Sequence, residues 1–570
     1  MYILGISAYY HDSAACLLKN GEIIAAAEEE RFTRIKHDSS FPNNAIKYCL
    51  KEAKISASQL SYVGFYEKPI VKFERILQTF TECYPSGFWM FHGAMPAWIN
   101  EKLRVRSIIR KKLGFKGKIV FIDHHTSHAS SAFFVSPFKK AAIMTVDGVG
   151  EWTTTSIQLG EGNAIKPLEQ VCFPHSLGLL YSTFTVFLGF HANNDEYKVM
   201  GLAAYGKPRY ISEMKKLIKI GDDGSFLLDM KYFDYRSGKR MWSREFENLF
   251  GKSRKEGEAI EIRHKDLAAS LQKVLEEAYT SIARHAFEIT KSENLCIAGG
   301  VGLNSVANGM LFESTPFQKI FVQPAATDAG GALGVAYYIW NCIEKNKRNY
   351  EMRHSAFGPN FSNAEIRKFL RGRKASFSFH SRARLLEQAA SLIADGRIVG
   401  WFQGSVEWGP RALGNRSILA DPTNPKMKDI VNIRIKRRED FRPFAGSVLQ
   451  EDVHKYFHVP EKNHRSPFMN FVFKVRKEKI QEIPSIVHVD GTCRIQTVSR
   501  DESALYYDLI KQFKKLTGVP VLLNTSFNLK GEPIVCTPQE AYEDFLKTPM
   551  DYLMLGNFIV KKGGSNQKKS

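Results

Sequence analysis

The 570-residue sequence lacks the marks of several protein classes. Its eight cysteines are scattered and none form a CxxC pair, so a zinc ribbon and a disulfide framework are both unsupported. Nothing approaches the roughly 18-residue uncharged apolar run of a membrane span. The N-terminal MYILGISAYYHD has neither the basic region nor the cleavage site of a secretory signal. These absences predict a cytoplasmic protein with no membrane span.

Acidic residues are the scarcer charge, with 59 Asp plus Glu against 80 Lys plus Arg, which gives a formal net charge of +21. Such a surplus attracts anions: nucleic acid, phosphorylated small molecules or an acidic membrane surface. The surplus is spread widely, so a generally basic surface is the simplest interpretation, and we expect no stable nucleic-acid partner.

The chain from Lys118 to Gly150 predicts two strands joined by a short Ala- and Ser-containing helix. Residues four apart lie on one face of a helix, so His124 and His128 should lie together while His125 is rotated away by roughly 100°. Asp147 follows the second strand. Two imidazoles and a carboxylate suit a divalent iron or zinc ion. The alternative is a surface histidine, a core histidine and a turn Asp.

The N-terminal 30 residues predict three strands, with Asn20-Gly21 as a two-residue hairpin turn. The loop YHDSA is similar to the first hairpin of sugar kinases and actin-like ATPases, which curls around a phosphate or reacting group. His11 and Asp12 in this loop can take a proton from a substrate hydroxyl. A loop Asp that caps its own backbone is an equal alternative.

Two later segments share the order strand, Gly-rich turn and helix, around Gly299-Gly300 and around Asp328 with Gly330-Gly331. Glycine lets the backbone approach a ligand, and a helix N-terminus offers N–H groups to phosphate. Because α/β folds bind ligands at strand ends, the pair predicts a nucleotide cleft. By contrast, HANNDEYKVMGLAAYG (residues 191–206) suggests a strand-edge loop leading into a turn.

Two polar or aromatic segments allow alternative interpretations. Residues 28–42, EEERFTRIKHDSSFP, form either a solvated face or the polar wall of a cleft. Residues 84–116 are aromatic and then basic. They predict a buried aromatic cluster followed by an exposed helix, with a membrane-surface helix as the alternative.

The second half is rich in cations near turns. Lys345 to Phe361 loses periodicity, and we place a linker there. Arg and Lys side chains are the usual clamp for phosphate, whereas surface ion pairs are the alternative for each one alone. The basic residues in question are Arg411, Arg416, Lys436, Arg437, Arg438, Arg442 and Arg494. The short polar residues Asn524, Thr525, Ser526 and Asn528 follow an apolar strand and can orient an oxyanion.

Taken together, these motifs closely resemble the NodU/CmcH O-carbamoyltransferase family. The resemblance covers nearly the whole chain. It rests on YHDSAA, EEERFTRIKH, HHTSHA, VDGVGE, EYKVMGLAAYG, GGVGLN, TDAGGALG, GPRALGNRSILADP, RPFAGSVL, DGTCRIQTV and NTSFN, in this order.

The resemblance implies an α/β fold of two domains. Residues 1–350 would form an actin-like domain resembling tRNA threonylcarbamoyl-transfer enzymes, with the metal and nucleotide site. Residues 351–562 would form a YrdC-like domain, and residues 563–570 a disordered tail. The YrdC-like half would join carbamoyl phosphate and ATP, with Mg²⁺, into carbamoyl adenylate, and the first domain would transfer the carbamoyl group to a substrate hydroxyl.

The resemblance also implies roles for individual residues. The metal, expected to be Fe(II), would be held by His124, His128, Asp147 and Asp328. The nucleotide would lie along Gly300, Asn304 and Gly331. The carbamoyl phosphate and ATP pocket would contain Arg411, Lys436, Arg442, Arg494, Asn524 and Ser526, with Arg438 and Asn528 nearby. The expected catalytic residues are His11, Asp12, Lys436 and Arg442.

The resemblance implies a hydroxylated small-molecule acceptor, such as an antibiotic, another natural product or a sugar, and a role in antibiotic biosynthesis or secondary metabolism. A homodimer is an open alternative to a monomer. A tRNA threonylcarbamoyl transferase is the alternative function, favoured by the positive charge. Hydrogenase-maturation carbamoyltransferases also resemble the chain, but they carry CxxC pairs that this sequence lacks.

Overall fold

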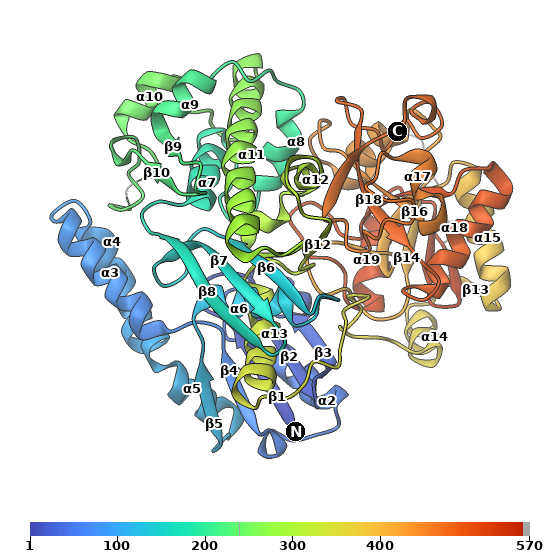
Figure 1. Cartoon of the computed structure of the whole chain (residues 1–570). Coiled ribbons are helices and arrows are strands. Elements are labelled where there is room, and N and C mark those ends of the chain that lie inside the picture. The colour runs from blue at the N-terminus through green and yellow to red at the C-terminus, as the bar shows by residue number, and fades with distance from the viewer. Residues whose placement is uncertain (239, 563–570) are drawn as a thin grey trace. The chain divides into compact units, whose positions relative to one another are not determined.

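The computed structural model describes residues 1–238 and 240–562; the predicted tail lies outside these residues. The chain forms two compact units (Figure 1). Unit 1 comprises Met1–Glu29 and His37–Met352, and unit 2 comprises Glu30–Lys36 and the chain from Arg353 onward. The predicted domain boundary was residue 350, and no feature of the sequence marked Glu30–Lys36 as part of the second unit.

The first sheet of unit 1 has the order β3-β2-β1-β4-β5. Strands β1, β2 and β3 are antiparallel, and β4 and β5 continue parallel to β1. The predicted hairpin turn is confirmed, since Asn20 and Gly21 both have positive φ, +52° and +85°. The strands are β1 (Tyr2–Ser7), β2 (Ala14–Lys19), β3 (Glu22–Glu28), β4 (Tyr62–Phe65) and β5 (Lys118–Phe121).

The second sheet of unit 1 repeats this topology in the order β12-β11-β6-β7-β8. Here β6, β7 and β8 are antiparallel, and β11 and β12 continue parallel to β6. This repeat confirms the predicted actin-like α/β arrangement. The strands are β6 (Lys140–Val146), β7 (Thr153–Glu161), β8 (Ala164–Cys172), β11 (Asn294–Ala298) and β12 (Lys319–Val322).

Two buried helices, α6 (His124–Phe133) and α13 (Asp328–Tyr338), lie against each other and against the strands of unit 1. A glycine in α13 lets the two helices approach each other closely. A Cβ at Gly334 of α13 would lie 1.8 Å from the Ser127 carbonyl oxygen of α6. This packing brings the N-terminal residues of both helices into one region.

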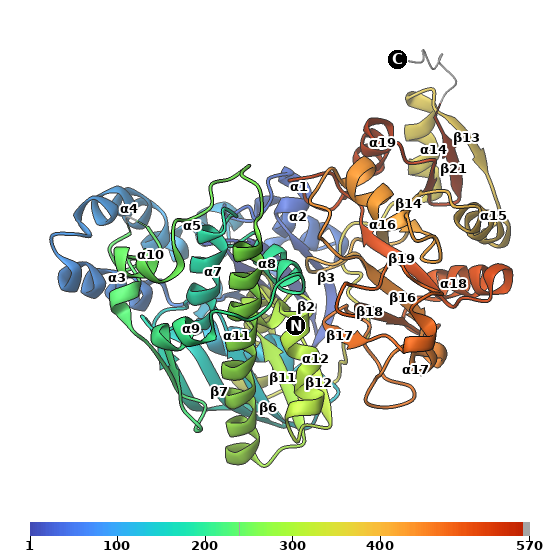
Figure 2. The same cartoon turned by 90° about the horizontal axis from the view of Figure 1, so that it is seen from above.

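Longer helices cover the second sheet, and the 29-residue α11 (Ile262–Thr290) runs along β6 and β7 (Figure 2). One prediction is wrong: residues 196–203 form a helix, α8, because Val199, Leu202 and Ala203 bury one face. The other elements of unit 1 are α2 (Asn43–Glu52), α3 (Pro69–Cys83), α4 (Phe88–Asn100), α5 (Val105–Leu113), α7 (Leu177–Phe187), α9 (Ile211–Leu217), β9 (Ile218–Ile220), β10 (Phe226–Leu228), α10 (Arg244–Phe250) and α12 (Ser305–Ser314).

Unit 2 is built on one nine-stranded mixed sheet of order β13-β21-β20-β14-β15-β19-β16-β18-β17. Its strands are β13 (Ser376–Phe379), β14 (Val399–Phe402), β15 (Arg416–Ala420), β16 (Ala445–Leu449), β17 (Phe471–Lys474), β18 (Thr492–Val498), β19 (Val521–Ser526), β20 (Tyr552–Leu555) and β21 (Phe558–Lys561). Its helices are α1 (Glu30–Thr33), α14 (Asn363–Gly372), α15 (Arg382–Ala394), α16 (Met427–Ile430), α17 (Val453–Tyr456), α18 (Ala504–Thr517) and α19 (Pro538–Lys547).

The short segment Glu30–Lys36 is held in unit 2 by two arginines. Arg31, only 1% exposed, donates from Nη2 to the Gly409 carbonyl at 2.8 Å. Arg34 donates from Nη1 to the Ile534 carbonyl at 2.8 Å. A solvated face is therefore excluded for Arg31. Across the described part of the chain, no helix has both the length and the apolar character needed to cross a membrane.

Candidate metal centre and cationic cluster

Helix α6 begins at the first of the predicted ligand histidines, and a buried carboxylate caps it. Both oxygens of Glu151 lie 3.1 Å from the backbone nitrogen of His124, and Oε1 also accepts from the Lys68 backbone at 2.7 Å. A negative charge at a helix N-terminus satisfies free N–H groups and the helix dipole. Glu151 thereby helps to fix the start of α6, and sequence reasoning missed it.

Four side chains from three segments converge within unit 1. The Nε2 atoms of His124 and His128 are 3.1 Å apart, which confirms that the two rings share one face of α6. His124 Nε2 lies 2.8 Å from Asp147 Oδ2, just beyond β6, and 3.6 Å from Asp328 Oδ1 at the start of α13. The corresponding distances from His128 are 3.4 and 3.7 Å.

These distances fit a shared metal ion. Ligands about 2.1 Å from a metal stand about 3.0 Å apart in an octahedron and about 3.4 Å apart in a tetrahedron. One donor atom from each of the four residues lies within 4.8 Å of all the others. Asp328 Oδ1 is buried and has no hydrogen-bond partner among the described residues, so it has a coordination position to offer.

The two carboxylates are oriented by hydrogen bonds on their other oxygens. Tyr66 donates its hydroxyl to Asp328 Oδ2 at 3.0 Å, and the Gly300 backbone donates to Asp147 Oδ1 at 3.0 Å. Such outer contacts fix the direction of a ligand. Gly300, assigned to the nucleotide by resemblance, thus also contacts a candidate ligand, and Tyr66 had no distinguishing sequence signal.

The electrostatics of the cluster is dominated by its carboxylates. Burial alone would lower the pKa of His128, but Asp147 and Asp328 outweigh it and raise this pKa to about 9. Burial would raise the pKa of Asp147, but His124 and His128 hold it well below its usual range. Burial would also raise the pKa of Asp328, but His11 and His124 lower it, so both acids are anionic.

His125 is not part of this cluster, as the helical spacing predicted. Its Nδ1 lies 2.7 Å from Thr145 Oγ1. Burial, and then the neighbouring His124, lower its pKa to about 3, so its ring is neutral. His125 is thus a core histidine with a hydrogen bond.

The predicted loop residues form a second polar group in unit 1. His11 Nδ1 lies 3.1 Å from Asp12 Oδ2, and His37 Nδ1 lies 2.6 Å from Asp12 Oδ1. Asn194 lies 2.9 Å from His37 Nε2. Burial alone would lower the pKa of His11, but the charges of Asp328 and Asp12 outweigh burial and raise this pKa to about 10. The sequence identified His11 and Asp12 but missed His37.

The remaining residues assigned to the nucleotide have structural contacts of their own. Asn304 caps α12 by accepting from the Ala307 backbone at 3.1 Å, and it donates to Gln272 at 3.0 Å. Gly331 lies in α13, where a Cβ would be 2.7 Å from Cδ2 of Tyr66. Their assignment to the nucleotide stays a prediction.

In unit 2, strand register aligns several of the predicted anion-binding residues. Ala445 of β16 pairs with Arg494 of β18 on one side and with Asn524 of β19 on the other. Ser526 lies two residues farther along β19, on the same face as Asn524. The sheet therefore presents Arg494 of β18 and both Asn524 and Ser526 of β19 on one face, with Ala445 of β16 between the two strands.

Lys436 is buried beside the end of β19. Its Nζ donates to the carbonyl oxygens of Ser526 at 2.7 Å and Asn528 at 2.9 Å. Burial, with Arg438 and Arg442, holds its pKa well below the usual range. Burial, and then Arg411, also lowers the pKa of Arg494.

We call Lys436, Arg411, Arg438, Arg442 and Arg494 the cationic cluster. Lys436 is buried and the four arginines are half-buried, and Arg442 Nη1 also lies 3.6 Å from Glu439 Oε2. A bound anion would relieve the repulsion among these cations, so the cluster suits a polyanion. Asn524 has structural contacts here, since its amide donates to Ser447 Oγ at 3.0 Å.

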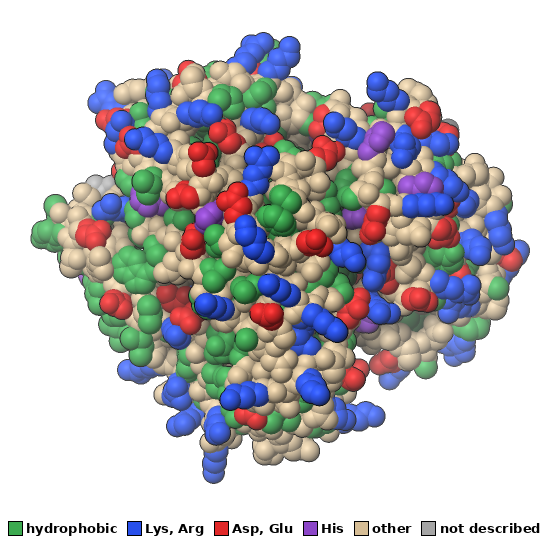
Figure 3. Space-filling model, viewed as in Figure 1, with side chains coloured by type: hydrophobic (Ala, Val, Ile, Leu, Met, Phe, Trp, Pro, Cys, Tyr) green, Lys and Arg blue, Asp and Glu red, His purple; other side chains and the backbone are tan. Residues whose placement is uncertain are grey.

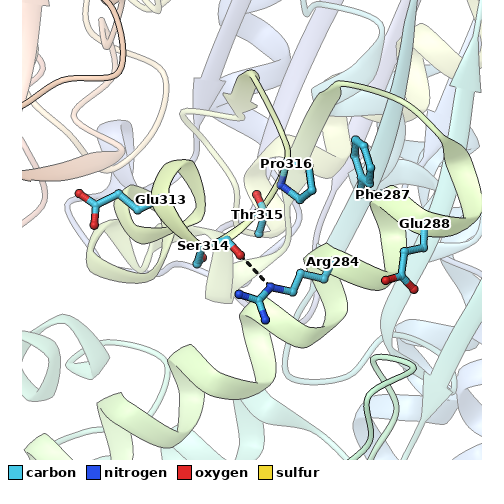
Figure 4. A pocket seen from close by; sticks show the side chains of 7 residues that line it. All are labelled: Arg284, Phe287, Glu288, Glu313, Ser314, Thr315 and Pro316. Carbon is cyan, nitrogen blue, oxygen red and sulfur yellow. Dashed lines mark hydrogen bonds between the residues drawn. The ribbon is translucent and has the colours of Figure 1, made fainter.

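A surface depression in unit 1 does not include either cluster (Figure 4). It is lined by the end of α11 and the residues around the end of α12, and Arg284 Nε donates across it to the Ser314 carbonyl at 2.7 Å. Its lining offers one bonded cation and two acids, Glu288 and Glu313, and we assign it no function.

Comparison with known families gives two matches that follow one another along the chain. Residues 2–337 match the family described as "Carbamoyltransferase N-terminus", and residues 390–562 match "Carbamoyltransferase C-terminus".

The curated relatives match over most of their length. "Uncharacterized protein sll1178" of Synechocystis is 47% identical, covering 100% of this chain and 98% of that protein. "Nodulation protein NolNO" of Sinorhizobium fredii is 39% identical over 98% of this chain and 80% of its own length. "Nodulation protein NolO" of Bradyrhizobium diazoefficiens is 40% identical over 77% of this chain and 79% of its own length.

Among solved structures, HypF of T. kodakarensis is 12% identical, with a TM-score of 0.32, over 60% of this chain and 48% of that one. ROK hexokinase of Thermus thermophilus is also 12% identical, with a TM-score of 0.30, over 61% of this chain and 100% of that one.

Removing one candidate ligand should remove the metal. Protein purified without chelator should contain about one transition-metal equivalent per chain, and His128→Ala should retain at least tenfold less, because a tetradentate site loses a donor. The matched control is His125→Asn on the same helix, which should keep the metal. Elemental analysis with thermal unfolding checks both variants; equal metal content in the two would contradict the assignment.

Proposed function

The chain belongs to the carbamoyltransferase family, and on that premise we propose that it is an ATP-dependent O-carbamoyltransferase for a hydroxyl group of a small molecule. In the first half-reaction, carbamoyl phosphate takes up water and releases phosphate, and the resulting carbamate displaces pyrophosphate from ATP. In the second, the acceptor hydroxyl attacks the carbamoyl adenylate, its proton is removed, and AMP leaves.

The observation that carries the proposal is that two chemically opposite clusters lie in different compact units. The four candidate metal ligands all belong to unit 1, and the cationic cluster belongs to unit 2. Two half-reactions with different electrostatic needs favour two sites of this kind.

The cationic cluster supports the first half-reaction. Carbamoyl phosphate and ATP are both polyanions that repel each other, so a site that brings them together must hold fixed positive charge. Lys436 is 4% exposed and is held by neutral oxygens of Ser526 and Asn528, which leaves its charge uncompensated by those contacts. Arg442 and Arg494 supply forked donors for phosphate oxygens.

The unit 1 cluster supports the second half-reaction. His124, His128, Asp147 and Asp328 would hold the metal, which, when bound, supplies a Lewis acid that polarises the carbamoyl or phosphate oxygen. Glu151 keeps His124 at the start of α6, and Tyr66 and Gly300 keep the two carboxylates oriented. These residues position the ligands before any substrate arrives.

The loop between β1 and β2 supplies groups for the acceptor. Each oxygen of Asp12 has a histidine partner, so Asp12 orients both His11 and His37. We assign the proton transfer from the acceptor hydroxyl to His11 or Asp12. His11 can accept this proton only when a cation held at Asp328 offsets the charge that raises its pKa to about 10. The charge of Asp328 contributes to the raised pKa of His11, which ties this loop electrostatically to the ligand cluster.

Damage to the cationic cluster should stop adenylate formation. Lys436→Ala should slow pyrophosphate release about a hundredfold, on the order of 3 kcal/mol, because it removes a charge that stabilises the transition state. Synthetic carbamoyl adenylate should restore transfer to the acceptor. Arg434→Ala, which removes an exposed charge from the same segment, is the matched control and should release pyrophosphate at the wild-type rate.

His128→Ala should show the opposite pattern. Pyrophosphate release should continue, because unit 2 is unchanged, while transfer to the acceptor is lost even with synthetic adenylate. The two-site mechanism fails if His128→Ala stops pyrophosphate release as completely as Lys436→Ala, or if neither variant responds to the adenylate as described.

The loop histidine and aspartate should affect transfer alone. His11→Ala and Asp12→Asn should each lower acceptor turnover with synthetic adenylate by at least about tenfold, as loss of a general base or its orienting partner does. The pH dependence of turnover should change as well. If both variants stay within about threefold of wild type, the loop does not act on the acceptor.

A further inference from the structure

Exposed apolar side chains are concentrated in one part of unit 1. Of the 19 large hydrophobic residues that are exposed in the described chain, eight lie between residues 70 and 103. They are Ile70, Leu77, Tyr84, Phe88, Trp89, Met90, Ile99 and Leu103. Isolated exposed apolar residues are ordinary, but a group of this size on consecutive helices marks an interaction surface.

Helix α4 is unusual because it contains no Asp, Glu, Lys or Arg although most of its residues are exposed. A helix that is apolar all round is normally buried. Trp89 is 78% exposed. The prediction of a buried aromatic cluster is therefore wrong at Phe88 and Trp89, although Trp98 is buried.

Other aromatic pairs hold α3 and α4 together. Phe80 stacks on Phe91 with ring centroids 4.2 Å apart, and Phe73 contacts Trp98 at 5.4 Å. The ring contacts of Trp89 are with Phe88 and His92 on its own helix. Helices α3 and α4 thus pack against each other through these aromatic pairs, and Trp89 lies outside this contact.

The segment that follows α4 along the chain is densely positive. Residues 102–118 contain eight Lys or Arg and no Asp or Glu, and most of these basic side chains are exposed. In Figure 3, hydrophobic side chains gather at the left edge of the molecule, where Figure 1 places α3 and α4.

We propose that α3, α4 and α5 form a peripheral docking surface for an anionic lipid bilayer. Trp, Tyr and Phe side chains favour the level of the lipid headgroups, and an apolar helix face inserts about 5–10 Å into that region. Basic residues beside it add attraction to anionic lipids, and stable anchoring takes two such signals together. This surface presents both.

The charge also selects against the main alternative occupant. A symmetric dimer through this surface would place two copies of the eight-cation segment at one interface, where like charges repel. An anionic bilayer gains from the same charge. The proposal is independent of the carbamoyl-transfer chemistry and concerns where the protein works.

Vesicle co-sedimentation of the full chain tests the proposal. Vesicles of phosphatidylcholine with phosphatidylglycerol should bind the protein at least about tenfold more strongly than phosphatidylcholine alone, and salt should weaken this binding. Three variants should each reduce binding. They are the double variant Phe88→Ser with Trp89→Ser, the single variant Ile70→Ser, and the double variant Arg110→Glu with Lys111→Glu. The matched control is Leu227→Ser, which removes a 57% exposed leucine on β10 and should bind as wild type.

Thermal unfolding and metal content should be unchanged in all these variants, since the substituted side chains are exposed. The proposal is overturned if the wild-type protein fails to bind the anionic vesicles. It is also overturned if the variants that replace Phe88 and Trp89, or Ile70, with Ser bind as strongly as the Leu227→Ser control. It is also overturned if sedimentation velocity shows a wild-type dimer that the Phe88 and Trp89 substitutions convert to a monomer without loss of vesicle binding.

Discussion

Asp328 carries a carboxylate with no exposed surface, and such a charge is stable only where donors or positive charge surround it. Here the Tyr66 hydroxyl satisfies Oδ2, the imidazoles of His124 and His128 lie near Oδ1, and the N-terminus of α13 adds a favourable dipole. The Oδ1 atom still has no hydrogen-bond partner among the described residues. A cation bound at Oδ1 would complete this balance.

The fold makes the convergence through its repeated sheets. Asp147 follows β6 directly, and α6 precedes the same strand, so three of the four candidate ligands come from one local unit. Asp328 comes from far along the chain, brought in by α13. The contact of Gly334 with the Ser127 carbonyl lets α13 lie close enough to α6 for the carboxylate to reach the histidines.

Local periodicity was sufficient to predict part of this arrangement. The i, i+4 spacing identified His124 and His128 and excluded His125, and Asn20-Gly21 identified the first hairpin. It was not sufficient for partners distant in sequence: Asp328 came from family resemblance, while Tyr66, Glu151 and His37 were missed, because a buried Tyr or a capping Glu has no spacing to mark it. The α8 segment was assigned to a loop because its small residues hid a helical apolar face. Strand register, which aligns Arg494 with Asn524 across Ala445, is also a tertiary property.

The most direct test of the central claim is X-ray absorption spectroscopy of the purified, metal-loaded protein. The account predicts a first shell of nitrogen and oxygen donors at about 2.0–2.2 Å with the scattering pattern of two imidazoles. His128→Ala should lose the metal or one imidazole contribution. A shell containing sulfur, or one without imidazole scattering, would contradict a metal centre built from His124, His128, Asp147 and Asp328.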